Sequence, residues 1–263
     1  YMHQALLEGR KYKSSTPPNP WVGCLIVKQG QIIGRGAHKG PGNPHAEIEA
    51  LRQVSDSQGA TLYSTLEPCC HYGRTPPCSK AIIEAGISRV VIGIEDPDPL
   101  VAGKGIKQLR EAGIEVCIGI LEDSIFADFY SYCFHRKFKR PLIIVKSASS
   151  LDGKIAAHDN SSKWISNDRC RHYVQYLRSC SQAILVGRKT VEIDKPRLNV
   201  RDFEVKKQPL RIVIDPKGRI EGISVQEGEV LIAVGEDASQ AKISAWRDSG
   251  IEVVILPKKN NGD

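Results

Sequence analysis

Short apolar runs alternate with helix-like patterns along the first half of this chain. Met2, Ala5 and Leu6 follow the i, i+3, i+4 spacing of a helix over residues 1–11. Apolar runs on either side of Gln29-Gly30 predict a β-hairpin over residues 21–36. The further predictions are helices over 45–54, 78–85, 104–112 and 123–135 and strands over 60–66, 89–94 and 114–120. Strands that alternate with helices indicate an α/β domain with parallel strand pairs.

The second half repeats this alternation after a polar link over residues 136–141. The predictions there are strands over 142–146, 183–187, 210–215, 230–234 and 251–256 and helices over 168–180, 188–194 and 238–249. Asn167 is the predicted N-cap of the helix that follows it. We therefore expect two α/β domains, residues 1–141 and residues 142–263, in line with the prior from chain length.

Composition narrows the class of protein without identifying it. Hydrophobic residues make up 41% and charged residues 25%, and no apolar run approaches the roughly 18 residues of a membrane span. No signal peptide is visible, and cysteines inside apolar runs favour a reducing cytoplasm. The net charge of +7 is spread evenly over both halves, without the basic run of a nucleic-acid footprint. We expect no nucleic-acid or membrane partner, and we leave room for a homo-oligomer.

Residues with metal-binding chemistry concentrate between Pro68 and Cys78, where three cysteines and a histidine fall within eleven residues. His45-Ala46-Glu47 lies upstream, at the predicted start of a helix. Zinc binds nitrogen and sulfur ligands tetrahedrally, and a catalytic zinc keeps three protein ligands plus water. One histidine, two cysteines and a glutamate that is not a ligand form the pattern of the zinc deaminases.

The identity of the second thiolate needs an argument, because the usual cysteine three residues after Cys69 is a tyrosine here. The thiolate must come from Cys70 or Cys78. Adjacent Cys69 and Cys70 would strain a tetrahedral site, so we predict His45, Cys69 and Cys78 as the zinc ligands. The alternative is a closed structural zinc with Cys70 or His71 as a fourth ligand.

Glu47 is the predicted proton shuttle of this site. It would take the proton of a zinc-activated water and pass it to the substrate ring nitrogen and then to the leaving ammonia. The hydroxide attacks a ring carbon that carries an amino group, and loss of ammonia leaves a ring carbonyl. The loop between the two thiolates carries His71 and Arg74, which suggests added substrate contacts.

The motifs of the first half resemble the bifunctional deaminase–reductase family of riboflavin biosynthesis. They are Asn19-Pro20, Gly36-Ala37-His38, His45-Ala46-Glu47, Thr65-Leu66-Glu67-Pro68-Cys69, Gly73-Arg74-Thr75-Pro76-Pro77-Cys78 and Asp96-Pro97-Asp98-Pro99. The resemblance implies a cytidine-deaminase-like three-layer α/β fold and zinc-dependent deamination of 2,5-diamino-6-(5-phosphoribosylamino)pyrimidin-4-one to 5-amino-6-(5-phosphoribosylamino)uracil. It also implies that Asn19 and His38 contact the base or ribose and that Arg74 meets the phosphate.

The second half resembles the reductase domain of the same family, a dihydrofolate-reductase-like α/β fold that uses NADPH to reduce the ribose to ribityl. The matching pieces include residues 148–154, 162–165 and 184–187. The resemblance implies NADPH contacts at Ala148, Trp164, Thr190 and Asp194, and substrate contacts at Ser162, Arg178, Leu198 and Arg201. Family members continue past the point where this sequence stops, so we expect the 263-residue chain to bind NADPH weakly or not at all.

Two other functions are compatible with the metal core. A tRNA or polynucleotide deaminase would share the core and suit a basic chain, but the even charge distribution and the Arg74 loop argue against it. A zinc module without activity would need a fourth protein ligand, and Glu47 beside His45 would then have no structural task.

Overall fold

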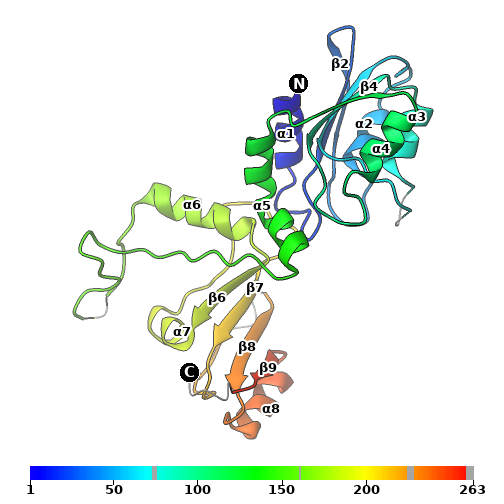
Figure 1. The fold of residues 1–263 in the computed structure, drawn as a ribbon. Coiled ribbons are helices and arrows are strands. Elements are labelled where there is room, and N and C mark those ends of the chain that lie inside the picture. The colour runs from blue at the N-terminus through cyan, green and yellow to red at the C-terminus, as the bar shows by residue number, and fades with distance from the viewer. Residues whose placement is uncertain (73–75, 160, 224–227, 259–263) are drawn as a thin grey trace. The chain divides into compact units, whose positions relative to one another are not determined.

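The fold is described from a computed structural model, which covers residues 1–72, 76–159, 161–223 and 228–258 (Figure 1). The chain forms two compact units, Tyr1–Val145 and Lys146–Asp263, and each is described by itself. Within the described ranges, no helix combines the length and the apolar character needed to cross a membrane.

A five-stranded sheet forms the centre of the first unit, in the order β2-β1-β3-β4-β5. Its strands are β1 (Gly23–Lys28), β2 (Gln31–Ala37), β3 (Thr61–Leu66), β4 (Arg89–Ile94) and β5 (Glu115–Ile118). β1 pairs antiparallel with β2, which confirms the predicted hairpin, and also with β3. β3, β4 and β5 run parallel, as the alternation of strands and helices predicts.

Helices cover both faces of this sheet and complete three layers (Figure 1). They are α1 (Met2–Arg10), α2 (Ala46–Leu51), α3 (Cys78–Glu84), α4 (Lys104–Glu111) and α5 (Glu122–Phe138). On one face, Phe129 of α5 packs into the same cluster as Leu25 of β1. On the other, Ile82 and Leu109 from α3 and α4 pack with Ile26 of β1. Neighbouring residues of β1 thus enter different cores, as the period of two along a strand requires.

The second unit is built on a four-stranded sheet in the order β6-β7-β8-β9, with every neighbouring pair parallel. Its elements are α6 (Asp168–Ser179), β6 (Ala183–Gly187), α7 (Arg188–Asp194), β7 (Leu210–Ile214), β8 (Val230–Gly235), α8 (Gln240–Asp248) and β9 (Glu252–Leu256). Its core gathers Val213, Ile232 and Ile243. Asn167 caps α6 as predicted, because its Oδ1 accepts a hydrogen bond from the Cys170 amide at 3.0 Å.

The prediction of a strand over residues 142–146 is wrong, because this segment is irregular in the structure. Ile143 and Val145 are 74% and 89% exposed, and within the described residues no strand pairs with the segment. β-Branched residues favour a strand only where a neighbouring strand supplies packing, so an apolar run alone does not make one here. The predicted link over residues 136–141 is also shorter than expected, because α5 continues to Phe138 and ends at Lys139 in the left-handed conformation.

Candidate zinc site

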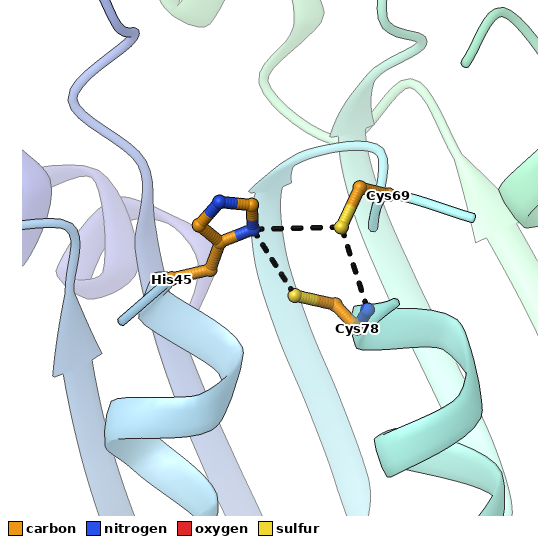
Figure 2. Close-up of side chains that lie close together, drawn as sticks. All are labelled: His45, Cys69 and Cys78. Atoms are coloured by element: carbon orange, nitrogen blue, oxygen red, sulfur yellow. Dashed lines mark hydrogen bonds between the residues drawn. The ribbon is translucent and has the colours of Figure 1, made fainter. Parts of the chain in front are cut away.

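Three side chains from separate elements converge at one point of the first unit: His45 precedes α2, Cys69 follows β3 and Cys78 opens α3 (Figure 2). Nδ1 of His45 lies 3.5 Å from Sγ of Cys69 and 3.3 Å from Sγ of Cys78. Tetrahedral zinc bonds of about 2.0–2.3 Å place ligand atoms roughly 3.3–3.8 Å apart. The ligand atoms of the three residues lie within 4.8 Å of one another, so a small adjustment of the side chains accommodates one zinc ion.

The start of α2 positions both His45 and Glu47. His45 is the N-cap of α2, with the extended backbone angles φ −70° and ψ 161°, and Glu47 lies in the first turn. The helix sits directly on β2, because a Cβ atom at Gly36 would fall 1.9 Å from the carbonyl oxygen of Ala46. The missing side chain at Gly36 therefore sets how closely the imidazole and the carboxyl group approach the site.

Two main-chain amides at the start of α3 donate hydrogen bonds to Cys69 and so connect the segments that carry Cys69 and Cys78. The amide of Cys78 donates to Sγ of Cys69 at 3.4 Å, and the amide of Ser79 donates to the carbonyl oxygen of Cys69 at 3.1 Å. Both amides belong to the first turn of α3, where N–H groups have no partner inside the helix. Such a helix N-terminus stabilises a thiolate, so the segment favours the metal-binding form of Cys69.

The charges of the site suit a cation. Hydrogen bonding from Cys78, opposed by burial and aided by His45, lowers the pKa of the Cys69 thiol to about 4. The hydrogen bond to Cys69 raises the pKa of His45 to about 9, and the Cys78 thiol has its pKa raised by its hydrogen bond to Cys69 and by burial. A thiolate already faces the two other groups, and both of these lose a proton when they bind a metal. The donor set therefore fits zinc in chemistry as well as in spacing.

Glu47 lies beside the ligands with only 3% of its surface exposed, outside the three-residue ligand group. Burial is the main cause that raises the pKa of its carboxyl group to about 7. A carboxyl group with a pKa near neutrality can both accept and donate a proton, which suits the predicted proton shuttle.

His38 and Asn19 form a hydrogen-bonded pair next to the ligands. Nδ1 of His38 lies 3.1 Å from the carbonyl oxygen of Pro44, which can only accept, so this nitrogen carries the proton. Nε2 is then the acceptor for Nδ2 of Asn19 at 3.1 Å. The ring of His38 also meets that of His45 edge to face, with centroids 5.6 Å apart. The structure thus brings two predicted substrate residues to the metal site.

The loop between Cys69 and Cys78 carries two further residues that the sequence predicts to contact substrate, His71 and Arg74. His71 is exposed, and Arg74 lies outside the described residues. Cys70 is half-buried, and its Sγ lies 3.9 Å from the carbonyl oxygen of Leu100. Among the described residues, the candidate ligand group contains His45, Cys69 and Cys78, and neither Cys70 nor His71 is a member of it.

In the second unit, Ser162 and Trp164 line a cavity of about 540 Å³. Oγ of Ser162 donates to Oδ1 of Asp194 at 3.2 Å, so a predicted substrate residue meets a predicted cofactor residue. The guanidinium of Arg171 lies 4.4 Å from the ring centroid of Trp164, whose surface is 71% exposed.

A second group of predicted residues surrounds Asn199. Nη1 of Arg178 donates to the Asn199 carbonyl oxygen at 3.1 Å, and Nη1 of Arg201 donates to Oδ1 of Asn199 at 3.2 Å. Burial and then the charge of Arg201 lower the pKa of Arg178. The other members are placed as follows: Leu198 is buried, Thr190 is exposed in α7, and Ala148 lies in an irregular segment. Their roles toward NADPH and substrate stay predictions.

Sequence reasoning assigned no role to Glu67, although its carboxylate is buried two residues before Cys69. The available signal was the position of an acidic residue directly between an apolar strand and Pro68.

Two families of known sequence match the chain. The family described as the cytidine and deoxycytidylate deaminase zinc-binding region matches residues 1–94, and the RibD C-terminal domain matches residues 141–259. The fold and the site together define a protein with an N-terminal zinc-dependent deaminase domain and a C-terminal reductase domain.

Individual relatives cover nearly the whole chain. It is 44% identical to the riboflavin biosynthesis protein RibD of Chlamydia muridarum, over 96% of this chain and 70% of that protein. The corresponding protein of Aquifex aeolicus is 43% identical, over 97% and 73%. The chain therefore belongs to the RibD family of riboflavin biosynthesis proteins.

Solved structures agree with this assignment. The diaminohydroxyphosphoribosylaminopyrimidine deaminase/5-amino-6-(5-phosphoribosylamino)uracil reductase of Thermotoga maritima matches with a TM-score of 0.85 at 37% identity, over 98% of this chain and 80% of that chain. RibD of Acinetobacter baumannii matches with a TM-score of 0.86 at 40% identity, over 97% and 73%.

Proposed function

We propose that the first unit deaminates 2,5-diamino-6-(5-phosphoribosylamino)pyrimidin-4-one to 5-amino-6-(5-phosphoribosylamino)uracil, with His45, Cys69 and Cys78 as zinc ligands and Glu47 as the proton shuttle. The observation that carries this proposal is a three-member ligand group beside a buried carboxyl group that is not part of it. A catalytic zinc needs an open coordination position, and a three-residue set leaves one. The name of the Thermotoga maritima relative supports the choice of substrate.

Zinc bound by these residues would supply a hydroxide nucleophile at neutral pH. The chain's own residues would manage the protons. Glu47 would take one proton from the attacking water and give it to the substrate ring nitrogen. It would then take the remaining proton from the hydroxyl group added to the ring carbon and deliver it to the departing amine. Water and the amino-bearing ring carbon thus yield a carbonyl and ammonia. The burial of Glu47 keeps bulk water from competing for that proton.

Asn19 and His38 would orient the substrate. Because His38 takes the amide hydrogen of Asn19, the Asn19 Oδ1 is the acceptor end of this pair. A fixed acceptor of this kind distinguishes a ring amino or hydroxyl group from a ring that lacks the donor. The second unit would follow with reduction of the ribose by NADPH, with Ser162, Trp164 and Asp194 as the contacts that the described cavity and hydrogen bond support.

Glu47→Gln tests the assignment of the proton shuttle. The variant should retain bound zinc and release ammonia about 10² to 10⁴ times more slowly, because the amide cannot accept the proton. Zinc content and ammonia release are measured on the same preparation. Glu49→Gln is the matched control, since Glu49 lies on the same helix and pairs with Lys39 at 2.6 Å. Full turnover by Glu47→Gln would remove Glu47 from the mechanism.

A further inference from the structure

The buried carboxylate of Glu67 accepts hydrogen bonds from four main-chain amides. It follows β3, and only 3% of the residue is exposed. Oε2 accepts hydrogen bonds from the amides of Gly103 at 2.9 Å and Asp96 at 3.2 Å. Oε1 accepts from the amides of Gly105 at 2.9 Å and Ile106 at 3.1 Å. One side chain therefore holds the loop after β4 and the first turn of α4 together.

These four hydrogen bonds from main-chain amides account for the burial of the Glu67 carboxylate. Two of the donors belong to the first turn of α4, where free amides and the helix dipole favour an anion. Hydrogen bonds to an ionised acceptor are about twice as strong as neutral ones. Glu67 thus fastens α4 to the end of β3, the strand that leads into the zinc-binding segment.

α4 also touches this segment directly. A Cβ atom at Gly105 would fall 2.1 Å from the carbonyl oxygen of Pro68 and 3.2 Å from Oε1 of Glu67. The helix backbone therefore rests on the peptide group immediately before Cys69. A displacement of α4 would move that peptide group, and with it the Sγ atom of Cys69.

A second attachment runs from α4 to the other thiolate. Oγ of Ser79 donates to Oε1 of Gln108 at 2.7 Å, and Ser79 directly follows Cys78 in α3. The amide of Ser79 also donates to the carbonyl oxygen of Cys69. α4 is thus joined to both thiolate-bearing segments, by Glu67 on one side and by Gln108 on the other.

We propose that Glu67 is a positioning residue for the metal: by fixing α4 to the segment before Cys69, it sets the separation and direction of the two thiolates. The proposal rests on the zinc ligands put forward above. Gln108 has the complementary task of holding α3, and Glu67 itself touches neither metal nor substrate.

Glu67→Gln in the full 263-residue chain tests the proposal. The amide oxygen can still accept two of the four hydrogen bonds, but the NH₂ group faces two amide donors, so α4 must shift. We expect zinc to bind about 10- to 100-fold more weakly, as for other partners that orient metal ligands. Zinc affinity is measured by competition with a chromogenic chelator. Cobalt(II) substitution gives a second readout, since its thiolate charge-transfer and d–d absorption bands report the ligand geometry.

Glu95→Gln is the matched control, because Glu95 is an exposed glutamate on the same loop after β4. It should leave the zinc affinity and the cobalt spectrum unchanged. A Glu67→Gln protein with wild-type zinc affinity and a wild-type cobalt spectrum, but a lower melting temperature, would show a purely structural role and overturn the proposal. A wild-type chain that binds neither metal would instead refute the zinc site itself, so the two failures are distinguishable.

Gln108→Ala keeps the test decisive if Glu67→Gln does not fold. Loss of the bond to Ser79 frees α3 without placing a new donor in the core, and zinc affinity should fall by a few-fold with a changed cobalt spectrum. Unaltered metal binding by Gln108→Ala would contradict the idea that α4 sets the geometry of the thiolates.

Discussion

The substitution Gly36→Ala should displace α2 without replacing any of the proposed zinc ligands. In the structure, a Cβ atom at this position of β2 would lie 1.9 Å from the carbonyl oxygen of Ala46 and 2.6 Å from the amide nitrogen of Ala50. Both atoms belong to the backbone of α2, so no side-chain rotation can relieve the overlap. Ala46 lies between His45 and Glu47, so the strain falls on the proposed zinc ligand and the proposed proton shuttle.

The size of the displacement follows from the contact distances. Ordinary contacts of a Cβ atom begin at 3.4 Å, so the separation from the Ala46 oxygen must grow by about 1.5 Å from its value of 1.9 Å. Zinc–ligand distances tolerate only about 0.2 Å, and a misplacement of about 1 Å near a reacting group can cost about 100-fold in rate. We expect kcat for ammonia release to fall by about 100-fold, together with a loss of stability of about 1–3 kcal/mol from overpacking.

The assay compares kcat, zinc content and melting temperature of the Gly36→Ala and wild-type chains. Gly187→Ala is the control, since a Cβ atom there meets no atom within 4 Å and its φ is −78°. It should match the wild type in all three measurements of the deaminase. A Gly36→Ala protein with wild-type kcat and zinc content would refute the reasoning that direct contact between β2 and α2 positions the site.

A further prediction concerns the buried acid Asp96. Burial is the main cause that raises the pKa of Asp96 to about 6 in the folded protein. Above about pH 4 the folded state therefore keeps a proton that the unfolded state has lost. The stability of the protein falls as the pH rises from about 4 to 6. In Asp96→Asn, the side-chain amide oxygen can still accept the hydrogen bonds from the Tyr132 hydroxyl and the Asp98 amide. Between pH 4 and 7 the free energy of unfolding of this variant should rise by about 3 kcal/mol relative to that of the wild type. Chemical denaturation that gives parallel pH profiles for the two proteins would contradict this prediction.

The predictions from sequence succeeded where the signal was local. The bounds of β4 agree with the prediction to the residue, because the run from Val90 to Ile94 is apolar and buried and Arg89 begins the strand. Asn167 was found as a cap because the capping bond spans three residues. The prediction of a strand over residues 142–146 was wrong for the opposite reason. A strand needs a neighbouring strand to pair with, and the composition of a segment does not indicate whether one is present.

The candidate metal ligands could be predicted because histidine and cysteine in close succession have few other uses, and the structure brings them together. The contacts that support them could not be predicted from the sequence. The amides bound by Glu67 lie 29, 36, 38 and 39 residues further along the chain. No periodicity connects positions so far apart. The close contact of Gly36 with Ala46 likewise depends on the path of the chain between β2 and α2 and not on either residue alone.

The nine-residue spacing of Cys69 and Cys78 is compatible with one metal site because hydrogen bonds hold the two cysteine-bearing segments together independently of the loop between them. Bonds from the Cys78 amide to Sγ of Cys69, and from the Ser79 amide to the Cys69 carbonyl oxygen, join the two ends of the loop directly. α4 is also hydrogen-bonded to the residues next to both ends of the loop, to Glu67 through its first-turn amides and to Ser79 through the side chain of Gln108. Because these contacts set the distance between the sulfur atoms, the chain between them is not constrained to one turn. The usual spacing of three residues is therefore one solution among several, and a longer excursion costs the metal geometry nothing as long as α4 stays in place.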